Sequence, residues 1–217
     1  MSKSTQREDH LKALYALGEL NEGQWVSTTQ MATHLGVKPP SVTAMVQVLA
    51  ELGWAEHRPY HGARLTAAGR KLALSLVRKH RLWETFLVDR LGFGWEEVHD
   101  IAEQLEHVDS VALVERLDAY LGHPKSDPHG DPIPKADGTF HPGGEECVLS
   151  ALKPLVRCEV TGVRNDNRDM LTAMTAKGIA LGGILTPEQV EALPSAWLDQ
   201  LMVRKAELQT KRNRKQI

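Results

Sequence analysis

The segment from His99 to His107 carries four side chains that can bind a metal ion. They are His99, Glu103, Glu106 and His107, at offsets of 0, 4, 7 and 8 along the chain. If the segment forms one α-helix with 3.6 residues per turn, the four side chains fall within an arc of roughly 100°. Apolar residues fill the opposite side. The spacing predicts a helix with one metal-binding face, and a merely solvated acidic face is the alternative.

A second pair of metal-binding types lies at His80 and Glu84, separated by four residues. Residues 78–87 also contain apolar side chains at helical spacing, which would pack inward. Two helices could therefore face each other across a metal. The alternative is an ordinary surface pair, which contributes only a few tenths of a kcal/mol.

The composition is that of an ordinary soluble globular protein. The chain has 217 residues, of which 41% are hydrophobic and 25% charged. Its first residues lack an apolar stretch, and nowhere do 18 apolar residues follow one another. We therefore expect a cytoplasmic protein without membrane contact. The two cysteines, Cys147 and Cys158, lack the spacing of a zinc site, so we assign them no chemistry.

The charge is distributed unevenly along the chain. The net charge is −2 overall, but residues 1–90 carry +4, residues 91–144 carry −8 and residues 145–217 carry +2. The acidic segment coincides with the candidate metal ligands. A local excess of carboxylates suits a divalent cation, and the positive first third can meet phosphates.

The first third has the pattern of a winged helix-turn-helix. Ser27 or Thr28 can cap a short helix that Gly36 ends, and Pro39 and Pro40 open a third helix. A Pro/Gly turn between two short extended stretches then predicts a β-hairpin wing. In such units the third helix enters the major groove and the wing approaches phosphates. The candidate DNA-binding residues are Ser27, Thr28, Lys38, Pro39, Pro40, Ser41, Thr43, Ala44, Gln47, Arg58, Tyr60 and Arg64.

Six short motifs together resemble the diphtheria toxin repressor family of metal-dependent transcriptional regulators, especially its manganese-responsive members. They are Pro39–Thr43, Tyr60–Thr66, Lys79–Leu82, Val98–His99, Leu105–Val108 and Asp127–Pro134. The resemblance implies a mainly α fold with a winged helix-turn-helix domain at 1–72, a metal-binding and dimerisation domain at 73–144, and an SH3-like (FeoA-like) β-barrel domain with a basic tail at 145–217.

The resemblance also implies two metal sites. A primary site would use Asp9, Glu103, Glu106 and His107, and an ancillary site would use His80, Glu84 and His99. The assignment of Asp9 as a ligand rests on the family resemblance alone. By itself, the sequence indicates only an acidic residue in the first turn of a helix, where the helix dipole favours it.

The donor atoms favour Mn²⁺, with Fe²⁺ as the alternative. Iron-type relatives have sulfur donors where this chain has Asp9 and Glu103, and hard oxygen donors suit manganese. Lys12 stands where the short two-metal manganese repressors have a second carboxylate, so two separated sites fit better than a close pair of ions. Ala44 replaces a base-reading Gln of some relatives, so no operator sequence can be transferred.

The last third is expected to complete the ancillary site. Residues 122–144 are rich in Pro, Gly and Asp, which predicts a linker. Strands are expected at 156–160 and 178–185, a helix at 170–176, and a helix fading into a basic tail at 201–217. Asp166 and Asp169 are candidate ancillary ligands, and helix-capping acids are the alternative.

The pattern as a whole predicts a homodimer that binds a palindromic DNA operator and represses metal-uptake genes when Mn²⁺ is sufficient. Candidate dimer contacts are Leu91, Phe93, Trp95, Val111, Leu113 and Leu117. An iron-dependent repressor of the same fold, a dinuclear metallohydrolase and a constitutive architectural protein are the alternatives.

Overall fold

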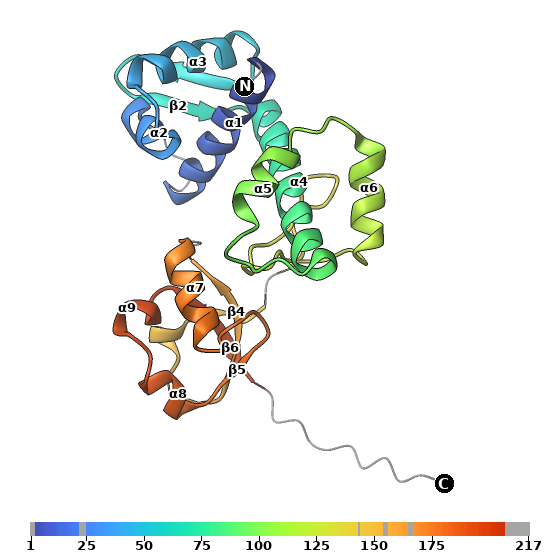
Figure 1. The fold of residues 1–217 in the computed structure, drawn as a ribbon. Helices are drawn as coiled ribbons and strands as arrows, with labels where there is room; N and C mark the ends of the chain where they lie inside the picture. The colour runs from blue at the N-terminus through green and yellow to red at the C-terminus, as the bar shows by residue number, and fades with distance from the viewer. Residues whose placement is uncertain (1–2, 22–24, 143, 154–155, 165–166, 207–217) are drawn as a thin grey trace.

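The computed structural model describes residues 3–21, 25–142, 144–153, 156–164 and 167–206. Its elements gather into three units (Figure 1), an N-terminal winged unit, a central helical unit and a C-terminal unit around a small sheet. No helix of the described residues is long and apolar enough to cross a membrane.

The N-terminal unit is the predicted winged helix-turn-helix. Its elements are α1 (Lys3–Leu20), α2 (Thr28–Leu35), α3 (Pro39–Glu51), β1 (Ala55–Arg58) and β2 (Gly62–Leu65). Ser27 caps α2 in a reciprocal capping box, and Gly36 ends it in the left-handed conformation at φ 64°. Val42, Val46 and Leu49 of α3 are fully buried against α1 and α2. Local sequence signals therefore determine this unit.

The wing is attached to the segment before α2. Val26 exchanges two backbone hydrogen bonds with Ala63 at 2.8 and 2.9 Å. Gly62 has φ +106°, and a Cβ atom there would lie 2.0 Å from the Val26 carbonyl oxygen. Only glycine permits this close approach.

The central unit is built on α4 (Ala67–Leu91), which Thr66 caps and which runs from the wing into the centre of the molecule (Figure 1). It is completed by α5 (His99–Leu105) and α6 (Val111–Tyr120). The expectation of one helix from His99 to His107 is partly wrong. The helix ends at Leu105, and Glu106 and His107 lie in the turn that follows.

The described part of residues 122–144 is more than a linker. Ile133 packs against Leu82 and Leu117, and Asp127 and His129 are buried. This irregular segment forms part of the central core, because its Pro and Gly residues prevent regular structure without preventing burial.

The C-terminal unit contains β3 (Cys147–Val148), the 3₁₀ turn Leu149–Ala151, β4 (Cys158–Val163), α7 (Arg168–Ala176), β5 (Ile184–Leu185), α8 (Pro187–Glu191), α9 (Ser195–Leu198) and β6 (Leu201–Lys205). The described strands form an antiparallel sheet in the order β3-β6-β4-β5, so the expected closed SH3-like barrel is not confirmed.

The expected helix from Leu201 is wrong, because Leu201–Lys205 is a strand. Leu201 and Val203 are fully buried while the residues between and after them are more exposed, a period of two that belongs to a strand. The expected basic tail lies outside the described residues.

The C-terminal unit contacts the central unit through Trp95 and the loop around His129. Trp95 is buried in the C-terminal hydrophobic core, and its Nε1 donates to Thr175 Oγ1 at 2.7 Å. The backbone N–H of Val163 on β4 donates to the His129 carbonyl at 2.8 Å.

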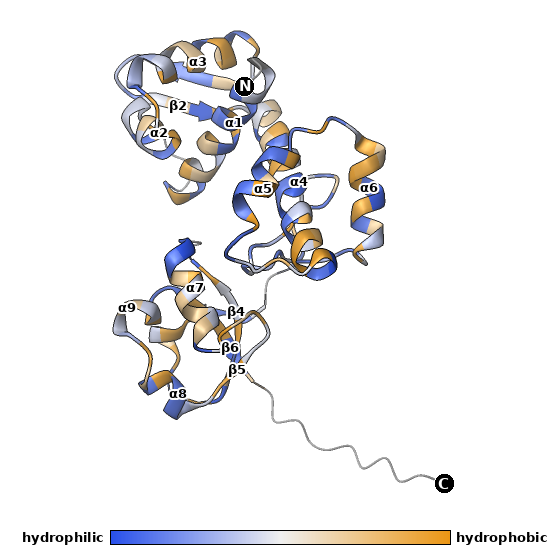
Figure 2. Cartoon of the chain, in the orientation of Figure 1, coloured by the Kyte–Doolittle hydropathy of each residue, from blue (hydrophilic) through white to orange (hydrophobic). Residues whose placement is uncertain are grey.

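Two of the six candidate dimer contacts are buried within the chain, so the prediction that they lie on the dimer surface is wrong. They are Trp95 and Leu117, each 7% exposed. Leu91, Phe93, Val111 and Leu113 are exposed. Figure 2 shows hydrophobic stretches along α6, which carries the last two.

Candidate metal centre and nucleic-acid interface

A buried carboxylate, Glu106, lies where α1, α4 and the end of α5 meet. Its side chain is 0% exposed. His80 Nδ1 donates to Glu106 Oε2 at 2.6 Å, and Lys12 Nζ donates to the same atom at 2.8 Å. Lys12 Nζ also lies 2.8 Å from Oε1, so its ammonium group faces both oxygens of the carboxylate. Burial raises the pKa of Glu106, but His80 and Lys12 outweigh it, so the pKa is lowered and the carboxylate is ionised.

Asp9, Glu106 and His107 form the first cluster of potential metal ligands, with one donor atom from each residue within 4.8 Å of the others. His107 Nε2 lies 3.3 Å from Asp9 Oδ1. His107 Nδ1 faces Glu8 Oε2 at 2.6 Å. When His107 donates its Nδ1 hydrogen to Glu8, Nε2 is left to bind a metal, an arrangement common around metal-binding histidines. Burial raises the pKa of Asp9.

Glu8 was absent from the expected site. Its role depends on a contact with His107, which lies 99 residues away in the chain. No spacing rule connects the two positions, so the sequence carried no signal for it.

Glu84 is the centre of the second and third clusters, and its side chain is only 2% exposed. Oε1 lies 3.0 Å from His80 Nε2 and 3.5 Å from His99 Nδ1, which forms the expected ancillary triad. Burial raises the pKa of Glu84, but the surrounding histidines outweigh it and hold that pKa far below its usual value. For His80, burial lowers the pKa, while Glu106 and Glu84 raise it more strongly.

The third cluster joins Glu84 to Asp127 and His129, which sequence reasoning did not include as ligands. His129 Nδ1 lies 3.6 Å from Glu84 Oε2, and Nε2 donates to the Trp95 carbonyl at 2.8 Å. Burial opposes protonation of His129, but Glu84 outweighs it and raises the pKa of His129 to about 9. Burial and the Glu84 charge raise the pKa of Asp127 to about 7.

The only signal for Asp127 and His129 was their place in the motif Asp127–Pro134, to which no role had been given. Their residue types suited a metal, but nothing local showed that an irregular segment would reach Glu84.

Glu103 was expected beside Asp9, and the structure does not bring the two into one cluster. Its Oε1 lies 3.5 Å from His99 Nε2 and 3.5 Å from Lys12 Nζ. The interaction with His99 lowers the pKa of Glu103 to about 2.

The structure also does not bring Asp169 to Glu84. Asp169 is exposed in the first turn of α7, where Asn167 is the capping residue. Asp166 lies outside the described residues.

The expected DNA-reading face of α3 is open to solvent. Ser41, Ala44 and Gln47 are exposed, together with Lys38, Pro39 and Pro40 at the start of the helix. Thr43 is half-buried and donates to the Pro39 carbonyl. Ser27 and Thr28 are half-buried at the start of α2, with Ser27 occupied as its cap.

The wing presents Arg58, Tyr60 and Arg64. Tyr60 is fully exposed at the tip with φ 65°. Arg58 and Arg64 lie over the Trp25 ring, with 4.7 and 4.9 Å from guanidinium carbon to ring centroid. Arg64 is also paired with Glu56 at 2.9 Å. Two fixed guanidinium groups and an exposed ring suit contact with a phosphate backbone.

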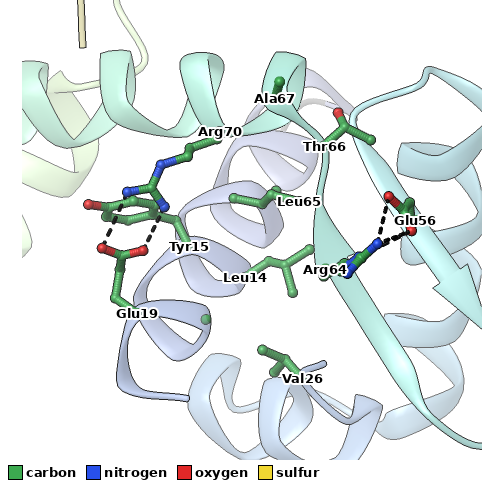
Figure 3. A pocket seen from close by; sticks show the side chains of 11 residues that line it. Leu14, Tyr15, Glu19, Val26, Glu56, Arg64, Leu65, Thr66, Ala67 and Arg70 are labelled. Atoms are coloured by element: carbon green, nitrogen blue, oxygen red, sulfur yellow. Dashed lines mark hydrogen bonds and ion pairs between the residues drawn. The ribbon is translucent and has the colours of Figure 1, made fainter. Parts of the chain in front are cut away.

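A pocket between α1, the wing and the start of α4 is shown in Figure 3. Arg70 donates to Glu19 at 2.6 Å and lies over the Tyr15 ring at 5.1 Å. Because Arg70 is on α4 and the other two are on α1, these contacts join the winged unit to the central helix.

Comparisons with known proteins agree with this architecture. Residues 3–63 match the family described as "iron dependent repressor, N-terminal DNA binding domain", and residues 66–135 match "iron dependent repressor, metal binding and dimerisation domain". The iron-dependent repressor IdeR of Mycobacterium leprae is 37% identical over 195 residues, which cover 83% of each chain.

Solved structures with the same fold include a manganese-dependent transcriptional repressor in complex with manganese. It is 34% identical, with a TM-score of 0.76 over 92% of this chain and 100% of that chain. ScaR with bound Zn²⁺ is 32% identical, with a TM-score of 0.70 over 92% of this chain and 99% of that chain.

The winged unit, the buried clusters and these matches define a metal-dependent transcriptional repressor. The chain belongs to the diphtheria toxin repressor family. The relatives named above include repressors that match nearly the whole chain, which removes the metallohydrolase alternative.

Proposed function

We propose that this chain is a Mn²⁺-dependent repressor that acts as a homodimer on a palindromic operator and turns off metal-uptake genes. The observation that supports it most is the cluster of Asp9, Glu106 and His107, which joins α1 of the winged unit to the turn after α5 of the central unit. The relative orientation of these two units determines whether a dimer can place two recognition helices on DNA.

The residues fit a divalent cation. Glu106 is ionised and fully buried, and it offers an oxygen within 4.8 Å of a ligand atom from Asp9 and from His107. Carboxylates gathered in a buried site need positive charge close to them, which Lys12 supplies to Glu106 in this structure. A bound divalent ion would supply positive charge that neutralises the carboxylates. Asp9, Glu106 and His107 would hold it, with Glu8 orienting the His107 ring.

A second ion would be held around Glu84. His80 and His99 approach one Glu84 oxygen, and His129 approaches the other, with Asp127 beside it. Glu84 is therefore proposed as the shared ligand.

The donor set favours Mn²⁺ over later metals. Asp9 and Glu106 offer carboxylate oxygens and His107 a single nitrogen, and sulfur is missing from all three described clusters. Oxygen-rich sites suit Mn²⁺, although intrinsic affinity follows the opposite order. Fe²⁺ stays the alternative, and the ion that acts in the cell depends on its availability.

Selection from a pool of random duplex DNA in the presence of Mn²⁺ would provide the operator. Mobility shifts would then measure binding to that operator with Mn²⁺, with Fe²⁺ and with EDTA. We expect binding with Mn²⁺, loss with EDTA, and palindromic sequences. Glu106→Gln should abolish the Mn²⁺ response. Glu191→Gln, an exposed change of the same type on α8, should retain it. Equal DNA binding in EDTA would refute the proposal, and a response to Fe²⁺ alone would replace manganese with iron.

A further inference from the structure

Lys12 places a positive charge inside the proposed metal site. It lies on α1 three residues after Asp9, so both side chains project from the same face of the helix. Its Nζ atom is 2.8 Å from the Glu106 carboxylate and 3.5 Å from Glu103 Oε1. The Lys12 side chain is only 20% exposed. The ammonium group is therefore held between two carboxylates.

The ammonium group does part of what a metal ion would do. It provides positive charge to the buried Glu106 and draws α1 towards α5 without a metal. It also lies 3.5 Å from Glu103 Oε1, an oxygen that His99 Nε2 approaches at the same distance. An ion bound by Asp9, Glu106 and His107 would meet a like charge at close range, and like charges repel strongly in a partly buried site.

We propose that Lys12 is a built-in competitor of the metal. It stabilises the metal-free arrangement of α1 and α5, reduces the affinity of the Asp9–Glu106–His107 cluster, and so raises the metal concentration at which the protein responds. The inference rests on the proposed function, because it assumes that this cluster binds the metal.

The proposal predicts effects of opposite sign when the charge is removed. In Lys12→Met, which keeps an unbranched apolar stem, the metal-free protein should unfold at a lower temperature because Glu106 loses its cation. The same variant should bind Mn²⁺ at this cluster about tenfold more tightly, within the range by which neighbouring residues alter metal sites. A residue that only supported the fold would weaken both properties when replaced.

The experiment compares wild type, Lys12→Met, Lys12→Arg and Lys177→Met by thermal unfolding without metal and by calorimetric and EPR titration with Mn²⁺. Lys12→Arg retains the charge and should bind Mn²⁺ like wild type. Lys177→Met, an exposed change at the end of α7, should alter neither property. Tighter Mn²⁺ binding by Lys12→Met together with lower metal-free stability would support the proposal.

Two results would overturn it. If wild type binds Mn²⁺ but Lys12→Met binds no more tightly, the inference fails while the proposed function stands. If wild type binds no Mn²⁺, the proposed function fails and the inference fails with it.

Discussion

Gly130 lies where the central unit meets the C-terminal sheet, and Gly130→Ala should separate them. Gly130 has φ +90°, and a Cβ atom there would lie 2.1 Å from the Thr161 carbonyl oxygen and 2.4 Å from Gly162 Cα. Both obstructing atoms belong to the backbone of β4, so no side-chain rotation can relieve the contact. The neighbouring loop residue is His129, which reaches Glu84.

The cost can be worked from these contacts. Forcing a Cβ into a left-handed conformation costs about 1–2 kcal/mol, and overpacking costs about 1–3 kcal/mol. If the loop instead leaves the sheet, the hydrogen bond from Val163 to His129 is lost at about 1 kcal/mol, together with the packing around it. For a chain of this size each kcal/mol lowers the unfolding midpoint by about 2–4 °C. We expect a decrease of roughly 5–15 °C.

Thermal unfolding and hydrogen exchange of residues 156–164 would measure both effects. The Val163 amide should exchange faster in Gly130→Ala, because its acceptor is the His129 carbonyl. Gly18→Ala is the matched control, since a Cβ on this α1 residue meets nothing within 4 Å. That change should leave stability the same or raise it by about 0.5–1 kcal/mol.

The same substitution tests whether the C-terminal unit supports the Glu84 clusters. Displacing His129 should weaken Mn²⁺ binding there by about 10- to 100-fold, while the Asp9 cluster is unaffected. Wild-type stability and unchanged Val163 protection in Gly130→Ala would refute the reasoning about docking.

Two further predictions concern protons and DNA. Because the pKa of His129 is raised to about 9, its ring is protonated at neutral pH, and metal binding there must release a proton. Mn²⁺ affinity should therefore rise as the pH increases towards 9, and the heat of binding should depend on the buffer; calorimetry that shows no buffer dependence would contradict this. A plot of log affinity for DNA against log salt concentration has a negative slope, and Arg58→Gln should reduce the magnitude of that slope by about one. Arg64→Gln should reduce it less, because Glu56 already neutralises Arg64. Equal slopes in wild type and Arg58→Gln would remove Arg58 from the phosphate contacts.

The winged unit was predictable because its signals are local. Ser27 and Gly36 determine where α2 begins and ends, and the pair Pro39–Pro40 determines where α3 begins, through capping and backbone geometry within a few residues. The juxtaposition of His80 and Glu84 was predictable for the same reason, since helical spacing places both side chains on one face.

The remaining parts of the site depend on contacts between distant segments. Asp9 needed the family resemblance, and Glu8 and His129 had no local signal because each acts through a residue far away in the chain. The strand β6 was predicted as a helix because five residues are too few to separate a period of two from a helical period. Its antiparallel pairing with β4 shows that it is a strand.

His80 connects the two metal clusters through its two ring nitrogens. Nδ1 lies 2.6 Å from Glu106 Oε2 and Nε2 lies 3.0 Å from Glu84 Oε1. A neutral imidazole has one nitrogen that can bind a metal and one that carries hydrogen. His80 can therefore act as a ligand in only one cluster, while its other nitrogen donates a hydrogen bond to the carboxylate of the other.

It follows that His80 links the two clusters. If His80 binds an ion beside Glu84, its Nδ1 hydrogen points at Glu106 and occupies an oxygen there. If it binds beside Glu106, Glu84 must rely on His99 and His129. Replacing His80 should consequently alter Mn²⁺ affinity at both clusters, whereas replacing His99 should alter it only around Glu84, a difference that EPR titration of the two variants can resolve. Equal effects of the two replacements would show that His80 does not link the clusters.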